Sequence, residues 1–204
     1  MRAAAAHLAA LDPVLADLVD RHGPPPRRRP VRVDQRFESL AEIIVYQQLA
    51  GRAAATIHGR FVESMTGSVT PEAVLAAPDG LLASSGLSRA KASSIRDLAA
   101  HVADGRIELE RIGRRPDEEV VDHLTQVRGI GPWTAQMFLL GTLGRLDVWP
   151  TGDYGVRAGF GRAWGMDETP TPMALTALGE PFRPYRSLVA WYCWRVVDER
   201  PDPV

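Results

Sequence analysis

The most informative stretch of the 204-residue sequence for chemistry is Val-Arg-Gly-Ile-Gly-Pro-Trp-Thr-Ala, residues 127–135. Gly129 and Gly131 permit backbone conformations closed to other residues, and they let main-chain N–H groups approach a phosphate with no Cβ in the way. Pro132 can open a helix whose N-terminal amides and dipole favour the same anion, while Ile130 is expected to anchor the turn in the core. The pattern predicts a phosphate-binding turn. A structural corner between two helices is the alternative that Gly-x-Gly spacing leaves open.

Two aspartates near this stretch are candidates for catalysis. Asp153 follows a Pro-Thr-Gly turn within WPTGDYGVR, residues 149–157, and precedes a predicted helix. A carboxylate there could stabilise positive charge on a reacting group, or orient and deprotonate a water molecule. By position alone, helix capping is the preferred explanation of Asp153. Asp147 is the competing carboxylate, and we assign it to the preceding turn, where an acceptor can satisfy loose amides.

Helical periodicity and caps dominate the elements that must position these residues. A sustained alternation of apolar and polar residues is absent, so the sequence predicts an all-α fold. Leu8, Leu11, Leu15 and Leu18 form one apolar stripe of the first predicted helix. The predicted helices span residues 3–21, 36–49, 52–65, 89–103, 117–127, 133–143, 154–163 and 184–198.

Composition limits the possible classes of protein. The chain has 24 basic and 25 acidic residues, a formal net charge of −1, so any binding of nucleic acid must depend on local motifs. No run of about 18 apolar residues exists, and the charged N-terminal stretch indicates an amphipathic helix rather than a secretory signal. The single cysteine, Cys193, excludes an internal disulfide and a four-cysteine metal site. We expect no membrane association and a cytoplasmic location, with the nucleoid as the site in a bacterium.

The complete string around the glycines resembles the helix-hairpin-helix motif of base-excision DNA glycosylases. Asp153 follows Trp133 by 20 residues, the spacing of the 3-methyladenine glycosylase II branch. Three further segments resemble the same superfamily: Ile-Val-Tyr-Gln-Gln-Leu-Ala (44–50), Gly-Leu-Ser-Arg-Ala-Lys (86–91) and Tyr-Arg-Ser-Leu-Val-Ala-Trp-Tyr-Cys-Trp (185–194). The resemblance covers roughly residues 8–198.

The resemblance implies two helical lobes with a DNA-binding cleft. We expect a single glycosylase domain over residues 1–204, with one lobe formed by about 1–45 plus 155–204. The middle lobe would span about 46–154 and contain the hairpin at 118–143. The larger relatives' N-terminal α/β domain has no counterpart, so the chain resembles a compact form.

By resemblance, Asp153 is the catalytic carboxylate, and Trp133 and Trp194 line the pocket for the damaged base. Leu49 is the expected wedge that enters the duplex, with a core leucine as the alternative. Neighbours of the pocket would be Tyr46, Met137 and Tyr192, and the DNA backbone would be held at Gly129, Ile130, Gly131 and Thr134. For Trp149, Trp164 and Trp191 we expect core packing instead.

The activity implied is monofunctional removal of alkylated bases such as 3-methyladenine and 7-methylguanine from double-stranded DNA after base flipping. Trp133 stands where bifunctional relatives carry a lysine, so no amine is available there for a Schiff base. No cofactor is expected, although the hairpin could hold a monovalent cation, and we expect a monomer. The alternatives are a glycosylase for deaminated or oxidised bases, a non-catalytic hairpin that only binds DNA, and a helical protein unrelated to DNA.

Overall fold

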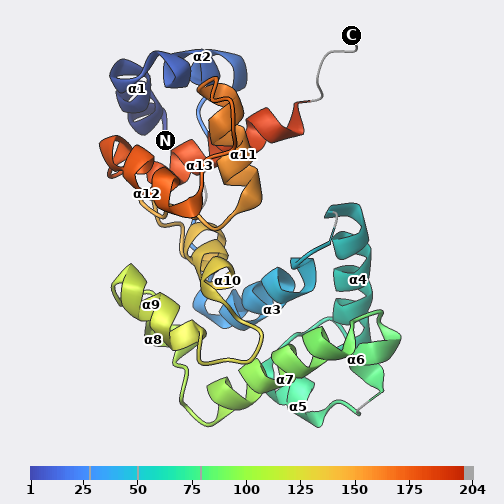
Figure 1. Ribbon diagram of the computed structural model, residues 1–204. Coiled ribbons are helices and arrows are strands. Elements are labelled where there is room, and N and C mark those ends of the chain that lie inside the picture. Colours follow the sequence, from blue (N-terminus) through green and yellow to red (C-terminus); the bar gives the residue numbers. More distant parts are fainter. Residues whose placement is uncertain (28, 50, 79, 200–204) are drawn as a thin grey trace. The chain divides into compact units, whose positions relative to one another are not determined.

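The computed structural model describes residues 1–27, 29–49, 51–78 and 80–199. These residues form helices and turns and include no β-strand, which confirms the predicted all-α fold (Figure 1). The chain forms two compact units. One unit combines Met1–Arg29 with Arg145–Val204, and the other is the continuous segment Pro30–Gly144. No helix among the described residues is long and apolar enough to cross a membrane.

The continuous unit is assembled around α3. This helix buries Phe37, Leu40, Ala41, Ile44 and Val45, and it packs against α4, α7 and the π-helical turn η2. The unit's elements are η1 (Val33–Gln35), α3 (Arg36–Tyr46), α4 (Gly51–Ser64), α5 (Pro71–Ala76), α6 (Leu81–Ser84), α7 (Arg89–Ala103), α8 (Leu109–Ile112), α9 (Asp117–Leu124), α10 (Pro132–Met137) and η2 (Phe138–Thr142). Because α3 is central to this unit, the boundary lies at Arg29–Pro30 and not near residue 45, where the sequence places it.

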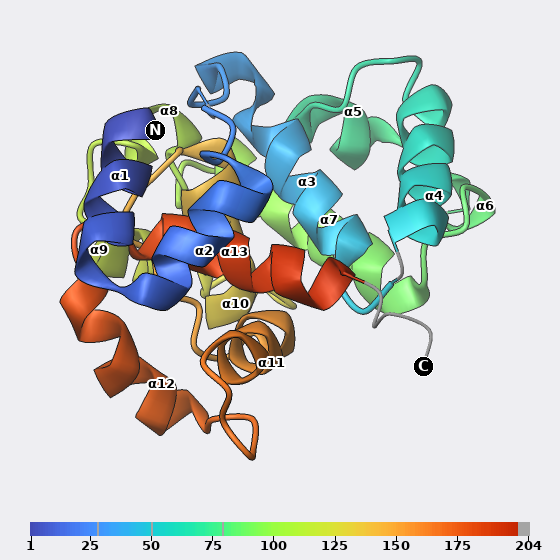
Figure 2. The same ribbon diagram turned by 90° about the horizontal axis from the view of Figure 1, so that it is seen from above.

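The second unit joins the two ends of the chain. Its elements are α1 (Arg2–Leu11), α2 (Pro13–His22), α11 (Tyr154–Ala163), α12 (Pro172–Gly179), η3 (Glu180–Phe182) and α13 (Arg186–Asp198). Figure 2 shows α13 beside α2, and the two helices are in contact. The shared core includes Leu8, Leu15, Leu18, Val156, Phe160, Leu188, Val189, Tyr192 and Val196.

Helices α11 and α13 make the most extensive helix–helix contact of this unit. Gly159 of α11 faces the backbone of α13, and a Cβ at this position would collide with the carbonyl group of Cys193. The absent side chain therefore lets the two backbones touch next to Trp194. This contact fixes the spacing of the helices that carry Asp153 and Trp194.

The first two predicted helices have different limits in the structure. The helix predicted over residues 3–21 is broken at Asp12, whose carboxylate accepts hydrogen bonds from the amides of Val14 and Leu15 and so caps α2. Pro13 occupies the first position of α2, where a missing N–H has no cost. The helix predicted to reach residue 49 ends at Tyr46, because Gln47 has φ −51° and ψ 128°, which is not a helical conformation.

Candidate active site

The glycine turn lies between α9 and α10, as the sequence predicts. Gly129 has φ +78°, a conformation that favours glycine, and a Cβ here would collide with the Ser94 hydroxyl of α7. Gly131 has an ordinary φ of −96° and open space where its Cβ would be. Gly129 is therefore required by local packing. Gly131 leaves the approach to the start of α10 open.

One buried side chain and three hydrogen bonds hold the turn in place. Ile130 is 4% exposed, which confirms its predicted anchoring role. The Arg128 amide donates a 2.8 Å hydrogen bond to the Asp97 carboxylate of α7. Gln47, just after α3, donates from its side-chain amide to the Gly129 carbonyl at 3.0 Å and to the Thr134 hydroxyl at 2.8 Å. The turn is thus supported by both α3 and α7.

Thr134 and Ile130 were both predicted to contact the DNA backbone. The Thr134 side chain is 2% exposed and engaged by Gln47, and the Ile130 side chain is in the core. Neither side chain can therefore meet a phosphate, and the Ile130 amide already donates to the Val127 carbonyl at 3.1 Å.

The predicted pocket and wedge residues of the continuous unit are at least partly accessible. Trp133 and Met137 lie one helical turn apart on α10, and both are half-buried. Tyr46, the last residue of α3, is also half-buried and makes an edge-to-face contact with His58. Leu49 is 38% exposed, which contradicts the core alternative and leaves the predicted wedge role open.

Asp153 is the N-cap of α11. Its Oδ1 accepts a 2.8 Å hydrogen bond from the Val156 amide, so the capping role foreseen from the sequence is real. The same oxygen accepts a 3.0 Å hydrogen bond from the Trp194 indole Nε1 on α13. Two donors on different helices therefore hold the half-buried carboxylate in one orientation. A carboxylate oriented in this way can stabilise a developing positive charge or direct a water molecule.

The predicted placement of Tyr192 beside the base pocket is wrong. Its side chain is fully buried, and its hydroxyl donates to the Gly23 carbonyl at 3.0 Å. Burial raises the pKa of Tyr192 to about 12. Tyr192 belongs to the core face of α13 with Leu188, Val189 and Val196, whereas Trp194 is half-buried.

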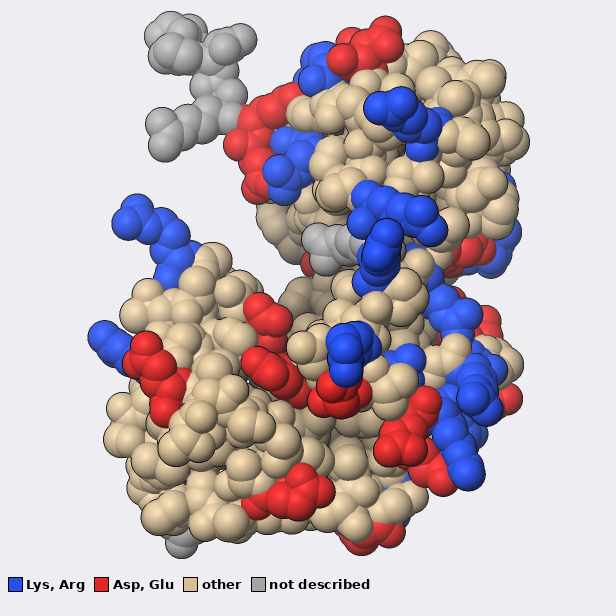
Figure 3. All heavy atoms as spheres, turned by 180° about the vertical axis from the view of Figure 1, so that it is seen from behind, with Lys and Arg blue, Asp and Glu red and all other residues tan. Residues whose placement is uncertain are grey.

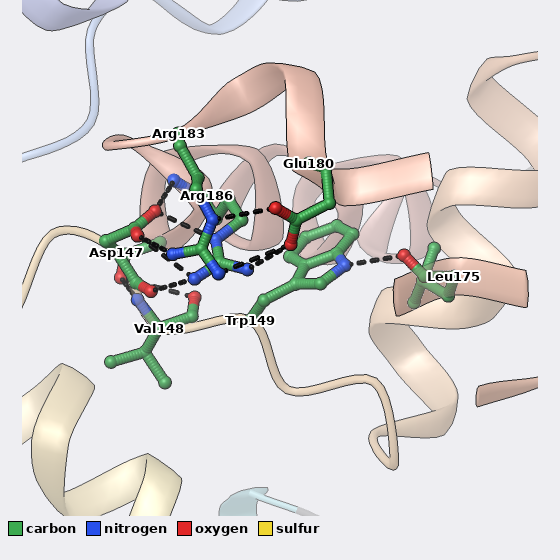
Figure 4. Close-up of polar contacts among 8 residues, drawn as sticks. Asp147, Val148, Trp149, Leu175, Glu180, Arg183 and Arg186 are labelled. Carbon is green, nitrogen blue, oxygen red and sulfur yellow. Dashed lines mark hydrogen bonds and ion pairs between the residues drawn. The ribbon is translucent and has the colours of Figure 1, made fainter. Parts of the chain in front are cut away.

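Asp147 forms a network of charges around Arg186 (Figure 4). Its carboxylate pairs with Arg186 at 2.8 Å and Arg183 at 2.7 Å, and Glu180 adds a 3.1 Å pair to Arg186. The prediction that Asp147 mainly satisfies loose amides is wrong, although it accepts one long hydrogen bond from the Arg186 amide. Burial alone would raise the pKa of Asp147, but the hydrogen bonds and charges of the two arginines outweigh it and lower the pKa.

The three remaining tryptophans have the core roles expected from the sequence. The Trp149 indole donates to the Leu175 carbonyl at 2.7 Å (Figure 4). Trp164 stacks on Phe160 with ring centroids 4.0 Å apart. Trp191 packs edge-on against Tyr192 and is also part of the core periphery.

The sequence interpretation leaves out two residues, one next to Asp153 and the other in contact with the hairpin. Tyr154 follows Asp153 directly and is 68% exposed, with the Arg157 guanidinium 5.7 Å from its ring centre. An aromatic residue directly after a candidate catalytic carboxylate is a sequence signal that can indicate a surface on which bases stack. Gln47 supports the hairpin across a separation of 82 residues from Gly129, which no local pattern reveals.

The chain has no overall surplus of basic residues, with 24 Lys and Arg against 25 Asp and Glu. On the face shown in Figure 3, acidic and basic side chains lie next to one another. Within the part of the chain that the structure describes, no group of three or more His, Cys, Asp or Glu side chains could hold a metal ion.

An all-α fold with a glycine turn between two helices is the architecture of helix-hairpin-helix proteins. Residues 41–184 match the family model described as "HhH-GPD superfamily base excision DNA repair protein". The chain belongs to this family.

Individual proteins of known name are similar over most of the chain. DNA-3-methyladenine glycosylase 1 of Schizosaccharomyces pombe is 32% identical over 93% of this chain and 84% of its own length. The solved structure of a 3-methyladenine DNA glycosylase from the same yeast, in complex with abasic DNA, has a TM-score of 0.88 and 32% identity, covering 96% of this chain and 97% of the other. The DNA-3-methyladenine glycosidase of Bacillus halodurans has a TM-score of 0.78 at 32% identity, covering 91% and 85%.

Proposed function

We propose that this protein is a monofunctional DNA glycosylase of base excision repair, which hydrolyses the N-glycosidic bond of alkylated bases in double-stranded DNA. The observation that carries the proposal is the Asp153 carboxylate, held by the Val156 amide and the Trp194 indole. Capping of α11 requires only the hydrogen bond from the Val156 amide, whereas the second hydrogen bond, from the Trp194 indole, is a feature that a module that only binds DNA does not need. The names of the similar proteins support the substrate class.

The Asp153 carboxylate stabilises the positive charge that develops on the sugar during the reaction. As the bond between C1′ and the base nitrogen breaks, its electrons leave with the base and positive charge develops on the sugar. Asp153 stabilises that charge and directs a water molecule to C1′. The water oxygen becomes the new hydroxyl of the abasic sugar, and the proton that the water loses passes to the carboxylate and from there to solvent. Because the carboxylate is already oriented in the protein, little reorganisation is needed when the substrate is bound.

Alkylated purines suit an aromatic pocket that offers no acid. 3-Methyladenine and 7-methylguanine carry a formal positive charge and are good leaving groups, so a general acid is dispensable. Trp133 and Trp194 offer electron-rich indole faces that attract a cationic base. The pocket roles of Tyr46 and Met137 belong to the same proposal.

DNA binding in this proposal depends on main-chain groups of the hairpin and on the exposed Leu49. Main-chain amides at Gly129, Gly131 and Thr134 hold the phosphates, and a monovalent cation could bind at the turn. Leu49 fills the space that the flipped base vacates and so offsets part of the unstacking cost of a few kcal/mol. The partner is duplex DNA with a damaged base, bound by a monomer in the compartment that holds the chromosome.

The decisive experiment measures abasic-site formation by the purified protein on duplexes that each carry one lesion: 3-methyladenine, 7-methylguanine, hypoxanthine or 8-oxoguanine. We expect release of the two alkylated bases and an intact abasic strand. Release of only hypoxanthine or 8-oxoguanine would overturn the substrate class, and binding without any release would indicate a non-catalytic module. Borohydride should trap no covalent enzyme–DNA adduct, because Trp133 occupies the position of the lysine that forms a Schiff base in bifunctional glycosylases.

A further inference from the structure

Gln47 connects the two parts of the continuous unit that are proposed to touch DNA. It is the first residue after α3 and precedes the exposed Leu49 by two positions. Its side chain reaches the hairpin glycine turn. One residue thus stands at the base of the Leu49 loop and also contacts the hairpin.

The hydrogen bonds use the full donor capacity of the Gln47 amide. A side-chain amide has two N–H donors, and here one is directed to the Gly129 carbonyl at 3.0 Å and the other to the Thr134 hydroxyl at 2.8 Å. The Gly129 carbonyl can only accept, so the NH₂ group and not the amide oxygen must face it. Gln47 therefore holds the turn on both sides of Gly131.

The main chain of Gln47 is held as well. Lys91 of α7 donates from Nζ to the carbonyls of Val45 and Gln47, both at 2.7 Å. Partial burial lowers the pKa of Lys91. The next residue, Gln48, has φ +56°, a strained conformation for a side chain of this size, and this turn presents Leu49. Such strain persists only where neighbouring contacts enforce it.

We infer that Gln47 is a positioning residue that fixes the Gln48–Leu49 loop to the phosphate-binding hairpin, so that the wedge and the backbone contact move as one piece. The inference deepens the proposed function and rests on it. In this arrangement, a phosphate bound at the hairpin sets the depth at which Leu49 meets the base stack. Gln47 itself need not touch DNA.

The test uses two variants of similar size and one matched control. Gln47→Met removes both donors without adding charge, and Gln47→Glu replaces them with a group that only accepts. Gln35→Glu makes the same change at an exposed residue of η1 and controls for the added negative charge. Single-turnover base release from an alkylated duplex should slow about tenfold in both Gln47 variants and stay unchanged in the control, as expected for two lost hydrogen bonds.

A double-mutant cycle with Leu49→Ala separates positioning from a general structural effect. If Gln47 acts through the wedge, Gln47→Met should slow base release about tenfold in the wild-type background and less than about twofold in the Leu49→Ala background. Equal losses in the two backgrounds, or no loss in either, would overturn the inference. Should Gln47→Met fail to fold, Thr134→Val removes one acceptor only, and its smaller slowing should disappear in the same way.

A measurement without catalysis distinguishes failure of this inference from failure of the proposed function. Native-state amide hydrogen exchange of Leu49 and Ile130 should accelerate together in Gln47→Met, while amides of α11 keep their wild-type rates. Unchanged exchange at both positions would show that Gln47 does not fix the loop, whatever the enzyme's substrate. If exchange is faster in Gln47→Met but the wild-type protein releases no base, only the proposed activity is overturned.

Discussion

The Nε1 atom of Trp194 lies 3.0 Å from Oδ1 of Asp153 and donates a hydrogen bond to it across the contact between α13 and α11. A tryptophan predicted to stack on a base therefore also orients the carboxylate predicted to act on the sugar. Its ring face and its N–H group have separate tasks, which substitutions can separate.

Trp194→Phe keeps an aromatic ring and removes the N–H donor. Base release should fall about tenfold or more, because a hydrogen bond to a charged group contributes about 1.5–3 kcal/mol. The loss should be similar for cationic and neutral lesions, since the carboxylate serves all of them. Single-turnover rates on both lesion classes provide the measurement. A loss restricted to cationic bases would show that the ring face, and not the N–H group, matters.

Asp153→Asn should abolish base release while binding of duplex DNA stays nearly intact. The neutral amide cannot stabilise positive charge on the sugar, and the expected loss is about a hundredfold or more. Asparagine is a good N-cap and can still accept from the Val156 amide, so α11 should remain folded. Single-turnover rates and duplex affinities provide the comparison.

The matched variant is Asp147→Asn, assayed at a temperature at which it is folded. Asp147 is occupied by Arg183 and Arg186, so its loss should leave turnover close to wild type. The reverse result, with Asp147→Asn inactive and Asp153→Asn active, would show that the two carboxylates are assigned the wrong way round.

Asp147 should instead contribute to stability in a pH-dependent way. Its pKa is lowered in the folded protein, so its ion pairs stabilise the fold above about pH 4, and this stabilisation is lost as the pH falls further. Asp147→Asn should lower the free energy of unfolding by about 1–3 kcal/mol at pH 7, because Arg186 is 9% exposed and loses its main partner. Denaturant titrations at pH 7 and pH 3 should show this difference shrinking with acidity. A constant difference would rule out ionisation as its cause.

Trp133→Leu should narrow the preference for cationic bases by roughly tenfold, because one desolvated contact between a cation and an aromatic face contributes about 1–2 kcal/mol. Cationic bases also leave faster in water, so the measured quantity is the enhancement over the uncatalysed rate for each lesion. An equal loss of enhancement for cationic and neutral bases would mean that the indole only shapes the pocket.

Local signals in the sequence were sufficient for much of the fold. Helices α7 and α11 have the predicted limits, because Ser88 and Asp153 are clear N-caps and the apolar spacing between caps is regular. The break at Asp12–Pro13 was also readable, as a capping residue followed by proline at the first helical position. The break is hard to recognise because the apolar stripe continues across it: Leu8 of α1 and Leu15 and Leu18 of α2 are all buried.

The site was less predictable because its supports are distant in sequence. Gln47 is hydrogen-bonded to two hairpin residues that follow it by 82 and 87 positions in the sequence. Trp194 is hydrogen-bonded to Asp153, which precedes it by 41 positions. Tyr192 was misplaced although its core role was readable, because residues 188, 189, 192 and 196 repeat at helical spacing and define the buried face of α13. Trp194 lies two positions away from Tyr192 and so projects from a different side of the helix.

The contact between Gly159 and the Cys193 carbonyl has a consequence for the entropy of the reaction. Main-chain atoms in direct contact have no rotamers to choose between, so the spacing of α11 and α13 is set when the chain folds. The orientational freedom of the Asp153 carboxylate is thereby lost once, in folding, and need not be lost again in each catalytic cycle. An alanine at this glycine would separate the helices and return that freedom to the carboxylate, without altering any group that reacts.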